Sequence, residues 1–202
     1  YKNIVGIIRQ PSFLFFDTSL LQTLPEAEWK NGFAEIIKHS AIKDAAMFRQ
    51  LREHDLDWYR KKKTELAALV RRNALLKTKV VQYDETEQGD RKLLNFGHTL
   101  GHALENQYEL SHGQAVSIGM TYAAHLSEEL LGFRQAEQLV ELISQYGLPT
   151  YADFDRTKVF DVLKHDKKRE RKNLHYILLE KIGKGVIHTL PLQEVKQLIE
   201  KI

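Results

Sequence analysis

One stretch of the chain constrains its fold more than any other, the apolar segment from 114 to 131. Residues Ala115 to Met120 within it would be apolar on almost every side of a helix. A helix with no polar face has no side that water can solvate, so it has to be buried. Gly132 follows the segment and suits a helix end. The sequence therefore predicts a buried helix around which other elements pack.

Segments with helical periodicity suit that packing. Residues 26–43 carry large apolar side chains at i, i+3, i+4 spacing, beginning at Trp29 and Phe33. Further helices are expected over 45–52, from 56 or 64 to 82, around 98–102, and over 134–146, 157–163 and 194–202. The runs 174–179 and 185–190, joined by a short polar segment, predict a β-hairpin. The predicted fold class is mainly α, with a small β-hairpin near the C-terminus.

The first residues follow a different pattern. Ile4–Ile8 and Ser12–Asp17 are short apolar runs that read as strands. Apolar runs of this length are typical of strands buried on both faces of an α/β sheet. No sheet-forming sequence precedes them, so we expect the chain to start within a larger protein.

Charge and cysteine content exclude several classes of function. The 30 basic and 27 acidic residues are mixed along the chain, giving a net charge of +3. Long-range attraction to nucleic acid is then weak, and the basic runs at 60–63 and 71–72 lack interleaved aromatic residues. There is no cysteine, which excludes disulfides, thiolate metal sites and thiol catalysis. Histidine, aspartate and glutamate remain as metal ligands.

The sequence shows neither the pattern of a membrane span nor that of a signal peptide. No segment reaches the roughly 18 consecutive apolar residues of a membrane span, and the start lacks a basic region followed by an apolar one. We therefore expect a soluble cytoplasmic protein with neither a membrane nor a nucleic acid as partner.

Three histidines gather in a short segment of small and apolar residues. His98 and His102 are spaced i, i+4, so they would lie on one helix face and could share a cation, as on metalloprotease helices. Thr99 stands where that signature requires a glutamate, which disfavours a metalloprotease. Two imidazoles and a carboxylate suit a catalytic zinc site with one open position. Hydrogen-bonded core histidines remain the alternative.

Neighbouring residues add to this picture. Gly97 and Gly101 each cost a helix about 1 kcal/mol relative to Ala, which suggests that a backbone or a ligand comes close. Asn95 is expected to be the N-cap of the helix that carries His98. Glu35 and Lys38 lie i, i+3 beside an apolar stripe, and their ordinary interpretation is a solvated ion pair. Lys77, between two apolar pairs, is expected near the core.

Taken together, several segments resemble the 3-dehydroquinate synthase family. The likeness runs in order over nearly the whole chain, and its most specific part is the Asn-Phe-Gly-His block that starts at Asn95. The segments that carry it are Gly32–Lys38, Asp84–Arg91, Leu94–Glu105, His112–Gly113 and Asp166–Lys168.

The resemblance implies a zinc- and NAD-dependent lyase of the shikimate pathway, with cobalt as an alternative metal. Such an enzyme converts 3-deoxy-D-arabino-heptulosonate 7-phosphate to 3-dehydroquinate and phosphate. Residues 1–19 would be the last strands of an N-terminal α/β NAD-binding domain, and residues 20–202 the C-terminal α-helical domain. The chain would then be inactive alone, and the full-length protein would be a homodimer.

The resemblance also assigns roles to individual residues. The zinc ligands become Glu35, His98 and His112, and His102 contacts the substrate, which replaces the i, i+4 pairing. Residues implied to hold the substrate's carboxylate, hydroxyls or phosphate are Lys38, Lys77, Arg91, Asn95 and, in preference to Lys167, Lys168. Residues implied to lie near NAD are Lys2, with Asn3, and the loop Leu20, Leu21, Gln22 and Thr23.

Four alternatives stay open from the sequence. A related sugar-phosphate cyclase or a metal-dependent polyol dehydrogenase would share the helical metal domain. A metal phosphohydrolase would use His165–Asp166 and would need no NAD. A helical scaffold without activity would bind no metal.

Overall fold

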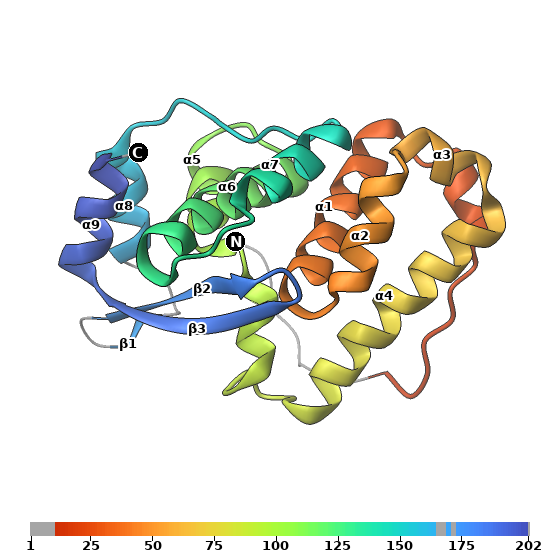
Figure 1. Cartoon of the computed structure of the whole chain (residues 1–202), viewed down its shortest axis with the longest axis horizontal. Helices are drawn as coiled ribbons and strands as arrows, with labels where there is room; N and C mark the ends of the chain where they lie inside the picture. The colour runs from red at the N-terminus through yellow and green to blue at the C-terminus, as the bar shows by residue number, and fades with distance from the viewer. Residues whose placement is uncertain (1–10, 165–168, 171–172, 202) are drawn as a thin grey trace.

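The computed structural model describes residues 11–164, 169–170 and 173–201. Its elements, shown in Figure 1, are the 3-10 helices η1 (Thr18–Thr23) and η2 (Asp90–Asn95); the α-helices α1 (Glu26–Lys43), α2 (Ala45–Glu53), α3 (Leu56–Lys61), α4 (Lys63–Tyr83), α5 (His98–Gln107), α6 (His112–Leu131), α7 (Ala136–Gln145), α8 (Arg156–Lys164) and α9 (Leu192–Lys201); and the strands β1 (Arg169–Glu170), β2 (Asn173–Lys181) and β3 (Lys184–Pro191). The mainly α fold with a hairpin near the C-terminus is confirmed.

Helix α6 lies in the middle of the fold. It contacts α1, α5, α7 and β2, with α2, α3 and α4 on one side and α8 and α9 on the other (Figure 1). Every residue from Ala115 to Ala124 is buried, as the apolar pattern predicts. The helix ends at Gly132 in the left-handed conformation. The sequence feature that constrains the fold most is therefore its central helix.

Helices α5 and α6 pack with their backbones close together. A Cβ atom on Gly119 of α6 would lie 1.9 Å from the carbonyl oxygen of Gly97, and one on Gly101 would lie 3.0 Å from the carbonyl oxygen of Ala115. No side chain fits at Gly119, because such a distance is far below van der Waals contact. Gly97 and Gly101 are expected from the sequence to lie close to a backbone or a ligand. What comes close to them is the backbone of the neighbouring helix α6.

In Figure 1 the hairpin of β2 and β3 lies below α6 and α7. Strands β2 and β3 pair antiparallel, with Tyr176 opposite His188, and the two-residue strand β1 pairs with the other edge of β2. Strand β2 contacts α6 through a hydrogen bond from the Leu179 amide to the Ser127 hydroxyl, 2.9 Å. Strand β3 contacts α1. The hairpin therefore joins the central helix to α1.

Two local predictions are wrong. Asn95 does not cap α5: it ends η2, and Gly97, at φ 75°, is the N-cap. The close approach of Gly119 explains this, since the chain has to turn sharply at Gly97 through a conformation that favours glycine. Lys77 is exposed on α4 rather than held near the core. Of the two starts expected for the next long helix, 56 and 64, the second is close to the structure, since α3 ends at Lys61 and α4 runs from Lys63 to Tyr83.

The second predicted N-terminal strand is also absent. Residues Ser12 to Asp17 form no strand, and Phe13 and Phe15 are 81% and 82% exposed. A strand needs a neighbouring strand to take up its backbone hydrogen bonds, and in the described residues the sheet of β1 to β3 does not pair with this segment. The run Ile4–Ile8 lies outside the described residues, and the domain boundary after residue 19 stays a prediction. Among the described helices, none has the length and apolar content needed to cross a membrane.

Candidate metal and substrate site

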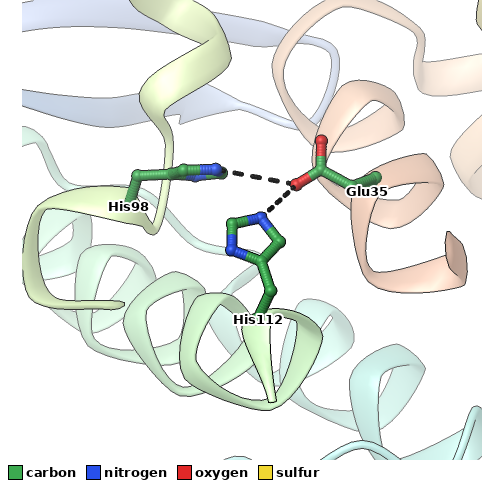
Figure 2. Close-up of side chains that lie close together, drawn as sticks. All are labelled: Glu35, His98 and His112. Atoms are coloured by element: carbon green, nitrogen blue, oxygen red, sulfur yellow. Dashed lines mark ion pairs between the residues drawn. The ribbon is translucent and has the colours of Figure 1, made fainter. Parts of the chain in front are cut away.

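Three side chains from three helices converge at the start of the central helix. Glu35 projects from the middle of α1, His98 begins α5 and His112 begins α6. Nε2 of His98 lies 3.6 Å from Glu35 Oε1, and Nε2 of His112 lies 3.4 Å from the same oxygen (Figure 2). One ligand atom from each residue falls within 4.8 Å of the others. The structure thus brings together three residues that are 63 and 14 positions apart in sequence, from 35 to 98 and from 98 to 112.

The spacing of these atoms fits a tetrahedral zinc ion. Zinc bonds of about 2.0–2.1 Å to nitrogen and oxygen give a tetrahedron with edges of about 3.4 Å. The separations of 3.6 and 3.4 Å from Glu35 Oε1 to the two imidazole nitrogens are close to that edge length. Glu35 Oε1 is also buried and accepts no hydrogen bond from the described residues. A buried carboxylate oxygen without a donor is costly, so these residues fit a cation between them.

The other oxygen of Glu35 is held by a buried lysine. Lys38 Nζ lies 2.8 Å from Glu35 Oε2, and its side chain is only 3% exposed. Burial acts to raise the pKa of Glu35, but the close contact with His112 and the charge of Lys38 outweigh it and hold that pKa well below its usual range. The carboxylate is therefore ionised. The interpretation of this pair as a solvated ion pair is wrong.

The two histidines differ in their surroundings. Burial and the charge of Lys38 lower the pKa of His98 to about 2, so its ring is neutral at pH 7. Its Nδ1 lies 3.1 Å from the Phe96 carbonyl oxygen, which leaves Nε2 for Glu35 and a cation. His112 is 40% exposed, and its contact with Glu35 raises its pKa. His98 forms the buried wall of the site and His112 its more open side.

Helix α1 also fixes the position where α6 begins. Asn31 Oδ1 accepts hydrogen bonds from the Ser111 hydroxyl, 2.7 Å, and from the Gly113 amide, 3.1 Å. A Cβ atom on Gly113 would lie 2.5 Å from the Asn31 Cα, so only glycine permits this contact. Ser111 and Gln114 form a capping box around the same turn. The backbone of His112 is thus held on both sides.

His102 lies at the open side of the cluster. Its ring centre is 5.0 Å from that of His98 and 6.3 Å from that of His112, and the residue is partly exposed. Together with Glu105 and His112 it forms a second group whose ligand atoms lie within 4.8 Å of one another. Its role as a substrate contact remains a prediction.

Sequence reasoning missed two residues that belong to this neighbourhood. Glu105 Oε2 lies 3.2 Å from His112 Nδ1. His39 is buried, its Nδ1 is 2.7 Å from Asn73 Oδ1, and its Nε2 is 3.8 Å from Glu35 Oε2. Burial and the charge of Lys38 lower the pKa of His39 to about 4. The available signal was helical spacing, since Glu105 follows His102 by three positions and His39 follows Glu35 by four.

The predicted substrate residues Arg91 and Asn95 lie at an acidic loop. Arg91 Nη1 donates to the Glu85 carbonyl, 2.6 Å, and Asn95 Nδ2 donates to Glu87, 2.5 Å. The carboxylate of Asp84 accepts the backbone amides of Gln88, Gly89 and Arg91. Lys77, on the preceding helix, is near enough for its charge to lower the pKa of His39.

The predicted NAD loop forms most of η1. Leu21 and Gln22 line a cavity of about 370 Å³ together with Trp29, Arg60 and Lys63, while Leu20 is exposed. The remaining candidates lie outside the described residues: Lys2, Asn3, Lys167, Lys168 and the pair His165–Asp166.

Comparison with known families gives a match over most of the chain. The family model described as 3-dehydroquinate synthase C-terminal matches residues 32–169. A 3-dehydroquinate synthase of Halalkalibacterium halodurans is 36% identical over 205 residues, covering 98% of this chain and 56% of the relative. One from Dehalococcoides mccartyi is 42% identical over 192 residues, covering 92% of this chain and 53% of the relative. The chain spans about half the length of these relatives.

Solved structures share the fold. A 2-deoxy-scyllo-inosose synthase complexed with carbaglucose-6-phosphate, NAD+ and Co2+ superposes with a TM-score of 0.80 at 24% identity, covering 100% of this chain and 59% of that one. A 2-epi-5-epi-valiolone synthase from Streptomyces hygroscopicus with NAD+ and Zn2+ bound gives a TM-score of 0.75 at 24% identity, covering 92% and 54%.

Proposed function

Because this chain belongs to the 3-dehydroquinate synthase C-terminal family, we propose that it supplies the metal- and substrate-binding side chains of a 3-dehydroquinate synthase. The reaction is conversion of 3-deoxy-D-arabino-heptulosonate 7-phosphate to 3-dehydroquinate with release of phosphate. The observation that carries the proposal is the cluster of Glu35, His98 and His112, in which a buried carboxylate oxygen faces two imidazole nitrogens and accepts no hydrogen bond from the described residues.

The metal in this proposal is zinc, held by Glu35 and the Nε2 atoms of His98 and His112. With two neutral imidazoles and one carboxylate as ligands, a zinc ion would keep a net positive charge and would lower the pKa of a bound substrate hydroxyl. Lys38 keeps the second oxygen of Glu35 occupied at 2.8 Å, so that Glu35 offers one oxygen to the metal. NAD, if bound, would supply the hydride acceptor, and the 2-epi-5-epi-valiolone synthase structure is described with both NAD+ and Zn2+ bound.

Cationic and polar groups near the cluster suit an anionic substrate. Lys38 carries its charge at the metal site, and His102 stands at the open side, where it can exchange a proton with a bound hydroxyl. Arg91 has the forked guanidinium that matches a carboxylate or phosphate. Arg91 donates a hydrogen bond to the Glu85 carbonyl, and Asn95 donates one to the Glu87 carboxylate. We propose that oxygens of the substrate replace these two acceptors.

We assign the loop Leu20 to Thr23 to the nucleotide side of the site. Its residues Leu21 and Gln22 face a cavity that also contains Arg60 and Lys63, two cations suited to an anionic cofactor. Turnover needs NAD held against the substrate, and we propose that the chain alone does not achieve this.

A chimera tests the proposal directly. In it, this chain replaces the matching segment of the Dehalococcoides mccartyi relative, which is 42% identical. Loaded with zinc, the chimera is expected to release phosphate from 3-deoxy-D-arabino-heptulosonate 7-phosphate only when NAD is present. A matched chimera with His102→Ala is expected to bind zinc and to lose turnover.

The same assay separates the rival functions. Phosphate release without NAD would indicate a phosphohydrolase. Faster release from a heptulose phosphate that lacks the carboxylate would indicate another sugar-phosphate cyclase. A folded, zinc-loaded chimera that releases no phosphate from either substrate would contradict the proposed function.

A further inference from the structure

His112 lies between two carboxylates. Its Nε2 is 3.4 Å from Glu35 Oε1 on α1, and its Nδ1 is 3.2 Å from Glu105 Oε2 on α5. The Glu105 side chain is 38% exposed, whereas Glu35 Oε1 is buried. The imidazole thus connects the buried cluster to a carboxylate at the protein surface.

Only one of the two ring nitrogens of a neutral His112 can bind a metal ion. A neutral imidazole carries one lone pair and one N–H group. If Nε2 binds a cation beside Glu35, Nδ1 keeps its proton and needs an acceptor. The group of His102, Glu105 and His112 could also hold a cation. Because Nδ1 of His112 faces Glu105, that cation would take the lone pair of Nδ1.

Burial decides between these two arrangements. Glu35 Oε1 accepts no hydrogen bond from the described residues and is closed to water, so a cation there removes a large cost. Glu105 is partly solvated, and its nearby partner is an imidazole nitrogen at hydrogen-bond distance. The cation therefore belongs on the Glu35 side and the proton of His112 on the Glu105 side.

We propose that Glu105 is a positioning residue that accepts the Nδ1 proton of His112 and so directs the Nε2 lone pair to the metal. The inference rests on the metal site of the proposed function. Carboxylates that orient a metal-binding histidine typically change metal affinity by 10- to 100-fold when they are removed.

The contacts around His112 make this role separable from folding. The backbone at His112 is held by Asn31 and by the capping box of Ser111 and Gln114. Glu105 contacts the ring and lies at the surface of α5. Removing its carboxylate frees the orientation of the ring and leaves the start of α6 in place.

The test compares three variants of the 202-residue chain, Glu105→Ala, Glu105→Gln and the control Glu109→Ala, whose residue is also exposed. Zinc affinity is measured by competition with a chromogenic chelator, and folding by thermal unfolding without metal. Glu105→Ala is expected to bind zinc at least about 10-fold more weakly with an unchanged unfolding temperature. Glu105→Gln is expected to lose less, because its amide oxygen still accepts the proton. Glu109→Ala is expected to match the wild type.

Nitrogen-15 NMR of the zinc-loaded protein gives a second readout. The Nδ1 atom of His112 is expected to carry a proton in the wild type and to bind no zinc. Equal zinc affinities for wild type and Glu105→Ala would overturn the inference, as would zinc on Nδ1. Failure of the wild type to bind zinc at all would overturn the metal site itself, and with it the role of Glu105.

Discussion

The metal cluster and the acidic loop from Asp84 to Asn95, which we propose serve the same active site, are built in different ways. The cluster is built from three packed helices, and Lys38 and His98 within it are buried. The loop is built from polar contacts at the surface, where Glu85, Glu87 and Gly89 are all exposed. Backbone packing fixes the first region, whereas one carboxylate, that of Asp84, organises the second.

This difference suggests a division of work within the site. Groups that bind a small ion need fixed separations, which tightly packed helices provide. Groups that bind a larger substrate need to exchange partners, which exposed hydrogen bonds permit at low cost. Substitutions in the cluster should therefore act on folding or on metal binding, and substitutions in the loop on neither.

The largest effect is expected from Gly119→Ala. Its Cβ atom would lie 1.9 Å from the Gly97 carbonyl oxygen, so α5 and α6 would have to separate. We expect a loss of about 3 kcal/mol or more in the free energy of unfolding, measured by urea denaturation without metal.

Gly32→Ala is the matched control. Gly32 lies inside α1, and a Cβ atom added to it would have no neighbouring atom within 4 Å. This variant is expected to gain about 0.5–1 kcal/mol, because Ala favours a helix over Gly. If both variants unfolded alike, close packing of α5 on α6 would not be what fixes the cluster.

The next effect separates two histidines on one helix. His98→Ala is expected to abolish stoichiometric zinc binding, because it removes one of three ligands. His102→Ala is expected to keep zinc, because His102 lies at the open side of the cluster. Zinc per chain, measured after dialysis, checks both variants, and equal loss in the two would contradict the assignment of ligands.

The smallest effect is expected in the loop. Asp84→Ala removes the acceptor of three backbone amides, so hydrogen exchange should accelerate at Gln88, Gly89 and Arg91. Zinc affinity should stay at the wild-type value, since no atom of the loop belongs to the cluster. A fall in zinc affinity as large as that of His98→Ala would mean that the two regions are coupled.

Helical periodicity was sufficient to predict most of the fold. The helix over 26–43 has the predicted bounds, and the central helix differs only in starting at His112. The failures depend on partners that periodicity does not reveal. Asn95 is a good cap by residue type, but the approach of Gly119 moves the cap to Gly97. Ser12–Asp17 has strand composition but no neighbouring strand in the described residues.

The candidate site was less accessible to spacing alone. The i, i+4 rule paired His98 with His102, whereas the atoms that face Glu35 Oε1 belong to His98 and His112. Spacing within a helix cannot report contacts between helices, so the resemblance to a family was needed to group Glu35 with these histidines. Burial of Lys38 was likewise hidden, because the elements that pack against α1 come from elsewhere in the chain.

Asn31 and Glu35 lie one turn apart on the same face of α1. Asn31 holds the start of α6 through hydrogen bonds from Ser111 and Gly113. Glu35 faces the imidazole of His112, the residue between those two. Any sliding or tilting of α1 therefore carries the start of α6 with it. We expect the separation of Glu35 from His112 to change little when α1 shifts relative to the rest of the domain.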